Sequence, residues 1–202
     1  MIHRLAEVAQ RNVSRETFEK IEAYTAMLRE ESQRQNLVSV SSVSQLWERH
    51  ILDSAQLVRF EPRAGASWVD IGSGAGLPGI VLACLVEGPV TLIEPRRLRA
   101  DFLHKVCESL DLRASVFLGK AERAEGSYEV ITARAVADLA NLLKISAHLS
   151  TRNSRWLLPK GRSAERELAE AQQAWQGAFH VERSATDPES RILVATRVRA
   201  RR

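Results

Sequence analysis

A glycine-rich stretch between residues 68 and 79 constrains the fold of this chain more than any other feature. Four β-prone residues, Trp68 to Ile71, are followed by glycines at positions 72, 74, 76 and 79, and an apolar run from Ile80 to Val86 comes next. Glycine is needed where the backbone takes a positive φ or where a ligand comes close to it. Pro78 suits the first turn of a helix. The stretch therefore predicts a strand, a tight turn and a helix, with a nucleotide-like ligand at the turn.

Two classes of ligand compete for such a turn. The dinucleotide-binding spacing G-x-G-x-x-G is satisfied from position 74 to position 79, and Glu94 stands about twenty residues further on, where an acid for a ribose is expected. Asp70 distinguishes the two classes. A carboxylate at the end of the strand would repel a pyrophosphate, but it could bind the α-ammonium group of a methionine moiety. The first motif of S-adenosylmethionine-dependent methyltransferases resembles the pattern found here, Asp70-x-Gly72-x-Gly74-x-Gly76. We expect that cofactor at the turn, in preference to NAD or to no ligand.

Length and composition bound the domain organisation. The chain has 202 residues, of which 45% are hydrophobic, and this fits one domain with an appendage. We expect an N-terminal helical segment over residues 1–61, packed on a methyltransferase domain over residues 62–202. No apolar run approaches eighteen residues and no signal-peptide pattern is present, so we expect a cytoplasmic protein with no membrane partner. Cys84 and Cys107 lie in apolar helical patterns without metal-ligand spacing, so we expect buried thiols and no metal.

Basic residues are numerous and clustered. The net charge is +4, and five lysines are outnumbered by 24 arginines. Genomic base composition explains an arginine bias as well as function does, but clustering favours a polyanionic partner. Several clusters follow predicted strands, where an α/β sheet places its ligand crevice. The clusters are Arg96, Arg97 and Arg99; Arg152 and Arg155; Lys160 and Arg162; and Arg197, Arg199, Arg201 and Arg202.

The order of elements indicates the fold class. Helical spacing predicts a short helix within residues 1–13, a helix from Ser14 to about Arg34 and a helix from about Ser44 to Arg59, with a break between them at residues 36–40. Strands and helices then alternate, which predicts an α/β fold with a mostly parallel sheet. Two final strands joined by a short turn must pair antiparallel. This layout is typical of the Rossmann-like class I methyltransferases, which have seven strands. The predicted strands are 67–71, 90–94, 114–118, 128–133, 154–158, 179–185 and 191–198, and the helices after residue 62 are 79–86, 96–110, 138–149 and 164–175.

Chemistry is expected where these strands end. Glu94 closes the second strand, where a carboxylate can accept hydrogen bonds from both ribose hydroxyls, although a solvent-facing acid is the alternative. Ala121 and Glu122 follow the third strand, where a backbone N–H can meet an adenine ring nitrogen and the acid can accept from its amino group.

Two cations follow the fourth and fifth strands. Arg134 stands among small residues, and a buried arginine needs a partner. A ligand carboxylate, an RNA phosphate and an internal acid all qualify, and we favour a ligand or substrate. Lys160 stands beside a flexible glycine, and we expect it to meet substrate phosphate. His50 and Asp53 lie three residues apart on the third helix, where a structural role is favoured over a catalytic one.

A known family shares these features in the same order along nearly the whole chain. The chain closely resembles the bacterial 16S ribosomal RNA guanine-N7 methyltransferase G family, also called glucose-inhibited division protein B. The resemblance implies that Gly72, Leu77, Ala121, Glu122 and Arg134 contact S-adenosylmethionine. It also implies a guanine target in the loop of small-subunit rRNA near the decoding site. The segments that carry the resemblance are Asn36-Leu37, Arg49-His50-x-Leu52-Asp53-Ser54, Asp70 to Gly79, Arg97-x-x-x-x-Phe102-Leu103, Ala121-Glu122, Arg134-Ala135 and Lys160-Gly161.

Guanine N7 has an in-plane lone pair and no proton, so its methylation requires no general base. We expect Asp53, Arg134 and Lys160 to position the reactants, and Asp53 or Glu122 to stabilise the charged product. The expected partner is 16S rRNA or the small ribosomal subunit, bound by a monomer. Methylation of a small molecule or a protein, an NAD-dependent oxidoreductase and a binding module without catalysis remain alternatives.

Overall fold

The centre of the molecule is an open sheet of seven strands. The computed structural model describes residues 1–39 and 45–201. The strands are β1 (Trp68–Ile71), β2 (Val90–Glu94), β3 (Ala114–Leu118), β4 (Tyr128–Ala133), β5 (Ser150–Lys160), β6 (Trp175–Arg183) and β7 (Arg191–Ala200). Their order in the sheet is β3-β2-β1-β4-β5-β7-β6. Strands β1 to β5 are parallel, and β7 pairs antiparallel with both β5 and β6. The expected Rossmann-like layout with an antiparallel C-terminal pair is confirmed.

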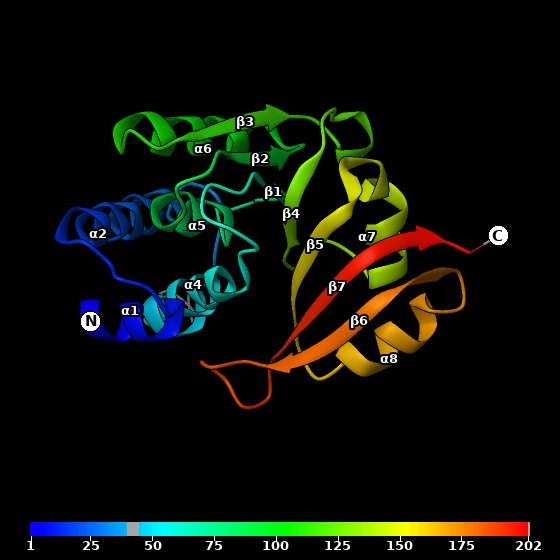
Figure 1. Cartoon of the computed structure of the whole chain (residues 1–202). Helices are drawn as coiled ribbons and strands as arrows, with labels where there is room; N and C mark the ends of the chain where they lie inside the picture. Colours follow the sequence, from blue (N-terminus) through cyan, green and yellow to red (C-terminus); the bar gives the residue numbers. More distant parts are fainter. Residues whose placement is uncertain (40–44, 202) are drawn as a thin grey trace.

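Helices cover both faces of the sheet (Figure 1). They are α1 (Ile2–Ala9), α2 (Arg15–Glu31), α4 (Asp53–Ala55), α5 (Gly79–Leu85), α6 (Arg97–Ser109), α7 (Leu139–Ser146) and α8 (Ala164–Ala171). Side chains of α1, α2, α4, α5 and α6 share one hydrophobic cluster with one face of the sheet. Side chains of α7 and α8 share a second cluster with the opposite face. The N-terminal helices therefore bury their apolar faces in the same core as α5 and α6.

Alternation along β1 decides which cluster each of its side chains joins. Trp68 belongs to the cluster that includes α5, whereas Val69 and Ile71 belong to the cluster on the other face. Asp70 shares the face of Trp68, so its carboxyl group points toward the start of α5. The turn after β1 lies between β2 and β4, where the direction of strand order reverses, and open α/β sheets bind ligands at such a point.

The N-terminal segment agrees with the sequence up to residue 39 and then differs. Ser14 caps α2 as predicted, because its side chain accepts a hydrogen bond from the N–H of Thr17. The third predicted helix starts at Ser44, which lies outside the described residues, as does Val40 in the preceding break. Its described part is a π-helical turn (Trp47–Leu52), then α4, then a 3-10 turn (Gln56–Phe60). Tertiary contacts override the regular helical pattern, because the amide of fully buried Gln56 must reach the β6–β7 turn.

The C-terminal third contains three further differences from the predicted elements. Helix α8 ends at Ala171, and Trp175 begins β6 instead of ending a helix, because it pairs with Ala200. Strand β5 begins at Ser150, four residues before the predicted start. The prediction missed these four residues because they are polar and mostly exposed, so they show no hydrophobic strand pattern. The predicted helix 138–149 ends at Ser146 and continues as a 3-10 turn to residue 149.

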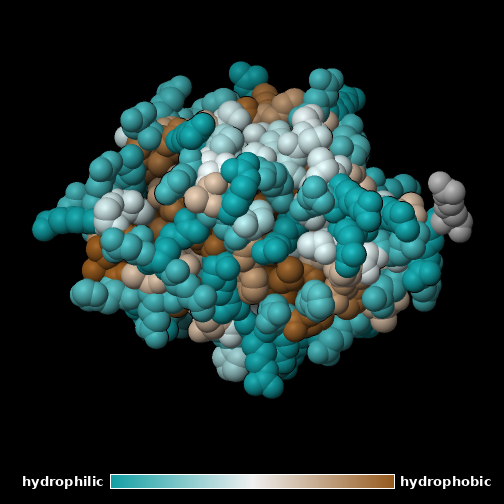
Figure 2. All heavy atoms as spheres, in the orientation of Figure 1, coloured by the Kyte–Doolittle hydropathy of each residue, from teal (hydrophilic) through white to brown (hydrophobic). Residues whose placement is uncertain are grey.

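Polar and charged side chains cover most of the face shown in Figure 2, and apolar residues show through in separate groups. Among the described residues, no helix is both long enough and apolar enough to cross a membrane. Cys84 and Cys107 are free thiols, the first half-buried and the second buried.

Candidate cofactor and substrate site

The side chain of Asp70 is hydrogen-bonded to the backbone of Gly79, the first residue of α5. This side chain is buried, at 1% exposure, and Oδ2 accepts a hydrogen bond of 3.0 Å from the N–H of Gly79. The first N–H groups of a helix have no partner within the helix, so the carboxylate satisfies one of them. A Cβ on Gly79 would come within 2.6 Å of Asp70 Oδ2. The glycine is therefore required for the strand and the helix to approach this closely.

The second carboxylate oxygen of Asp70 is left without a partner. Oδ1 is buried and accepts no hydrogen bond within the described part of the chain. Burial raises the pKa of Asp70 from 3.8 to about 7, because the charged form loses its water. A buried polar atom without a partner is costly in a folded protein. The atom is thus suited to a cationic donor that arrives with a ligand, such as an α-ammonium group.

The glycines of the turn have different surroundings. Gly72, Gly74 and Gly76 all have positive φ, at 68°, 56° and 96°. A Cβ on Gly72 would lie 2.6 Å from a methyl group of Val136, in the loop after β4. A Cβ on Gly76 would instead meet Tyr24, at 3.1 Å from its hydroxyl oxygen. Gly72 therefore faces the loop that follows β4, whereas Gly76 is packed against the helical layer.

Tyr24 supports the turn from α2. Its buried hydroxyl donates a 2.9 Å hydrogen bond to the carbonyl of Ala75. Burial raises the pKa of Tyr24 well above its ordinary value, so the hydroxyl remains a donor. Sequence reasoning missed this residue, because Tyr24 is only one more apolar position on a helical face. The N-terminal segment thus holds the glycine turn directly.

Glu94 lies beside the turn at the end of β2. Its side chain is buried, at 3% exposure, which excludes the solvent-facing alternative. Oε2 accepts from the N–H of Gly74 and Oε1 accepts from the N–H of Arg96, both at 2.8 Å. A carboxylate oxygen can accept more than one hydrogen bond, so each retains capacity for a ribose hydroxyl.

Ala121 and Glu122 lie in a 3-10 turn (Ala121–Arg123) after β3. Ala121 is buried and packs in the second hydrophobic cluster, whereas Glu122 is exposed. The first N–H groups of a helical turn lack partners within it. The first backbone N–H groups of this turn are therefore available to donate, and their contact with an adenine ring nitrogen stays a prediction.

Arg134, after the end of β4, meets an internal acid. Its Nη1 lies 3.1 Å from His50 Nδ1 and 3.8 Å from Asp53 Oδ2. Asp53 and His50 are therefore internal partners of Arg134, and the expectation that this arginine also meets a ligand or substrate stays a prediction. Asp53 Oδ1 in turn accepts from Gln56, at 2.8 Å, and from Thr186 in the β6–β7 turn, at 3.2 Å.

The imidazole of His50 is neutral in this setting. Burial, Arg134 and Arg49 together lower the pKa of His50 to about 4. Its Nδ1 must accept from the guanidinium, so the ring proton is on Nε2. Burial raises the pKa of Asp53, and Arg134 opposes that shift. The structural role favoured for His50 and Asp53 agrees with these contacts, since both side chains hold Arg134.

Lys160 also has internal partners. Its Nζ lies 2.7 Å from Glu167 Oε2 and 3.2 Å from the carbonyl of Ala137, and only 12% of the side chain is exposed. Glu167 and the carbonyl of Ala137 are therefore internal partners of Lys160, and the expected contact with a substrate phosphate stays a prediction. Burying an ammonium group requires a partner, and α8 supplies the acid.

The three residues predicted to position the reactants nevertheless lie around one cavity. Asp53, Arg134 and Lys160 line a space of about 590 Å³, together with Gly161 and Arg191. The cavity lies at the carboxyl ends of β4 and β5, on the side of the sheet edge that carries the glycine turn. The cavity is large enough to admit a nucleotide base.

The basic clusters do not all lie at this edge. Arg96, Arg97 and Arg99 begin α6 beside the glycine turn, as expected. Arg152 precedes the core of β5 and Arg197 lies near the end of antiparallel β7, so both lie at the opposite edge of the sheet. The expectation that clusters after strands rim the crevice is wrong for the cluster at the end of β7, because that strand is antiparallel; Arg152 does not follow a strand and was not part of that expectation. Arg202 lies outside the described residues.

Comparisons with known proteins agree with this geometry. A family model described as rRNA small subunit methyltransferase G matches residues 17–190. The ribosomal RNA small subunit methyltransferase G of Zymomonas mobilis is 44% identical over 195 residues, which cover 92% of this chain and 88% of that protein. The relative of the same name from Sphingopyxis alaskensis is 48% identical over 186 residues, covering 91% of this chain and 80% of its own length.

Solved structures share the fold at much lower identity. A SAM-dependent methyltransferase from Aquifex aeolicus has a TM-score of 0.61 at 14% identity, covering 82% of this chain and 96% of its own. Aeropyrum pernix fibrillarin, solved with natively bound S-adenosyl-L-methionine, has a TM-score of 0.56 at 13% identity, covering 74% and 75%. From the match over residues 17–190 and the identity to curated relatives, this chain belongs to the rRNA small subunit methyltransferase G family.

Proposed function

We propose that this chain transfers a methyl group from S-adenosylmethionine to N7 of a guanine in the decoding-region loop of 16S rRNA. The observation that carries the proposal is the unpaired Oδ1 of buried Asp70, at a glycine turn of a chain in this family. We further propose that the protein acts as a cytoplasmic monomer on RNA or on the small ribosomal subunit.

The residues around the turn fit the cofactor. S-adenosylmethionine supplies an electrophilic methyl group on a sulfonium when it is bound. Asp70 Oδ1 is free to accept from an ammonium group, and Glu94 can accept from ribose hydroxyls. The positive φ of Gly72 and Gly74 leaves the backbone of the turn open to close approach. The remaining predicted contacts are Leu77, Ala121, Glu122 and Arg134.

The proposed reaction at N7 requires no general base, because this nitrogen carries no proton. Among the described residues, carboxylates and one lysine line the cavity of about 590 Å³, and none of them has a proton-transfer role in the proposed reaction. The protein contributes by holding the two reactants in line and by surrounding the new positive charge with acids. Asp53 is one such acid, and its contact with Arg134 fixes its position.

The substrate assignment can be tested directly. Purified protein and methyl-labelled S-adenosylmethionine are incubated with small subunits from cells that lack the gene, and N7-methylguanine is mapped by strand cleavage. We expect one labelled guanine in the decoding-region loop. Asp70→Ala should abolish the label, whereas Asp101→Asn, which changes an exposed carboxylate on α6, should retain it. Label at another atom or another RNA region contradicts the proposal, as does turnover of a small molecule without RNA.

A further inference from the structure

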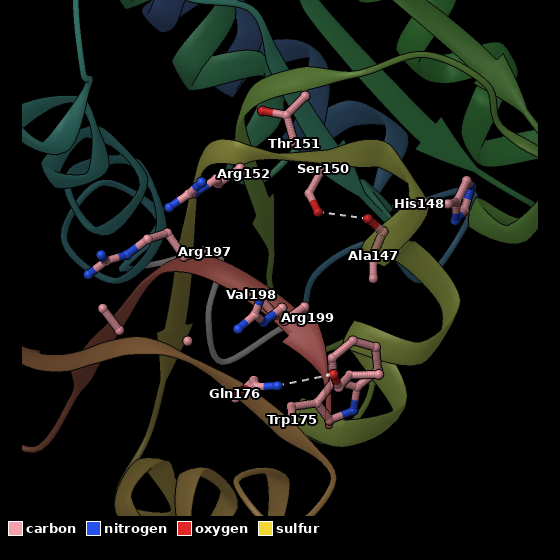
Figure 3. Close-up of a pocket in the computed structure, with 13 residues that line it drawn as sticks. Ala147, His148, Ser150, Thr151, Arg152, Trp175, Gln176, Arg197, Val198 and Arg199 are labelled. Carbon is pink, nitrogen blue, oxygen red and sulfur yellow. Dashed lines mark hydrogen bonds between the residues drawn. The ribbon is translucent and has the colours of Figure 1, made fainter. Parts of the chain in front are cut away.

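A second groove lies at the edge of the sheet opposite the glycine turn. It has a volume of about 900 Å³ and is formed by the start of β5, the start of β6 and the end of β7 (Figure 3). Because β5 is parallel to β1 and β7 is antiparallel to β5, these strand ends point away from the cofactor edge. The groove is therefore separate from the cavity lined by Asp53, Arg134 and Lys160.

The charged side chains that line this far-edge groove are all positive. Arg152, Arg197 and Arg199 line it, and there is no aspartate or glutamate among the described residues of its lining. In Figure 3 the side chains of Arg152 and Arg197 extend toward the same side of the view, while Trp175 lies on the other side. The three arginines are exposed and make no ion pair or side-chain hydrogen bond within residues 1–39 and 45–201. Three neighbouring cations without an internal counter-charge create a local positive potential.

The backbone at Arg197 is irregular, and this irregularity changes the direction in which its side chain points. Arg197 has a φ of 55°, in the left-handed region that favours glycine. The pairing of β6 with β7 shifts register between Gln176 and Ala178, opposite this position. A bulge of this kind redirects a side chain, and strained residues concentrate at functional sites. No internal contact of the Arg197 guanidinium offsets that strain within the described residues.

The end of β7 is nevertheless held firmly in place. Arg201 Nε donates to the carbonyls of Gln172, at 2.7 Å, and Trp175, at 3.3 Å, and its backbone N–H donates to Ala174 at 2.8 Å. These hydrogen bonds attach the end of β7 to the segment that leads into β6, so the two elements that form this side of the groove are tied together.

We propose that the far-edge groove binds the phosphate backbone of ribosomal RNA, as a contact separate from the site of methyl transfer. The inference rests on the proposed function, because it takes RNA as the substrate. A concave surface with spaced guanidinium groups suits consecutive phosphates, which arginine binds in a bidentate manner. A flat lipid surface does not fit a groove of this shape.

The test compares two triple variants with equal loss of charge. One is Arg152→Gln, Arg197→Gly and Arg199→Gln. The control changes three exposed arginines on or beside α2 to Gln, namely Arg15, Arg29 and Arg34. Binding to unmodified 16S rRNA transcribed in vitro is measured at several salt concentrations. Each lost phosphate contact should reduce the slope of log K against log salt by about 0.7 to 0.9.

We expect the groove variant to bind RNA about tenfold or more weakly, with a slope smaller by about 2 units, and the control to bind like the wild type. Methyl transfer should show a raised KM for the RNA with little change in kcat. Equal RNA binding by wild type and groove variant overturns the inference. Binding to phosphatidylglycerol vesicles that is lost in the groove variant, without loss of RNA binding, overturns it in favour of a lipid surface.

The fold of the variants is checked by thermal unfolding. Since glycine accepts a positive φ, Arg197→Gly should melt at the same temperature as the wild type or higher. If the triple variant does not fold, Arg152→Gln and Arg199→Gln are tested singly, and wild-type affinity in both overturns the inference. The binding comparison needs no catalysis, so an absence of N7-methylguanine would count against the proposed function alone.

Discussion

Replacing Asp70 by asparagine should change how the stability of the ligand-free protein depends on pH. Burial raises the pKa of Asp70 from 3.8 to about 7, so the folded protein binds this proton more tightly than the unfolded chain does. The stability that Asp70 contributes is therefore fully present below about pH 3.8 and is lost as the pH rises to about 7. A shift of about 3 pKa units corresponds to about 4 kcal/mol, of which about 3 kcal/mol falls between pH 5 and pH 8.

Urea unfolding of the wild type and Asp70→Asn, followed by tryptophan fluorescence at pH 5, 6, 7 and 8, measures this effect. The free energy of unfolding of the variant, relative to the wild type, should rise by about 3 kcal/mol across that range. His50, whose pKa is lowered to about 4, acts in the opposite direction in both proteins, so it cancels in the difference. A difference that stays constant with pH would mean that the Asp70 carboxyl ionises normally in the folded protein, contrary to this expectation.

The same carboxylate should make ligand binding depend on pH. An ammonium group at Oδ1 requires the ionised form, which is the minor form below about pH 7. The affinity for S-adenosylhomocysteine should therefore rise up to about tenfold per pH unit between pH 5.5 and 7 in the wild type. Asp70→Asn should bind weakly with little dependence on pH, as calorimetry would reveal.

Three other changes test the contacts around the site. Gly79→Ala places a Cβ 2.6 Å from the carboxylate that precedes the turn, so urea unfolding should show a loss of about 1 to 3 kcal/mol, and a neutral effect would contradict the close approach. Tyr24→Phe leaves a buried carbonyl of the turn unpaired and should cost about 1 to 3 kcal/mol, together with weaker S-adenosylhomocysteine binding; unchanged binding would mean that α2 does not support the turn. Arg134→Gln removes a positive charge 3.1 Å from His50, so the histidine pKa measured by NMR should rise from about 4. An unchanged pKa would mean that Arg134 does not lie beside His50 in solution.

The parallel core was predictable because its signals are local. Strands β2, β3 and β4 match the predicted bounds, since each is a short run between clear turn residues. The glycine turn was equally readable, because a positive φ restricts the residue type more strongly than burial does. The sequence also placed Asp70 correctly at the strand end beside the turn.

The partners of charged groups could not be predicted in the same way. Arg134 and Lys160 were expected to meet ligands, and both also contact an internal acid. Asp53 lies far from Arg134 in the chain, whereas Glu167 lies only seven residues after Lys160, on the next helix. A single sequence contains no signal for such a pairing. The start of β6 at Trp175 was missed for a similar reason, because its strand geometry comes from pairing with the end of β7.

We propose that this chain places a methyl group on N7 of one guanine in the decoding-region loop of 16S rRNA, and this can be tested in cells. The most direct measurement is chemical cleavage at N7-methylguanine in 16S rRNA from cells with the gene, without it, and with the Asp70→Ala form. We expect one cleavage site in that loop, present only with the intact gene. An identical cleavage pattern in all three strains would contradict the proposed function.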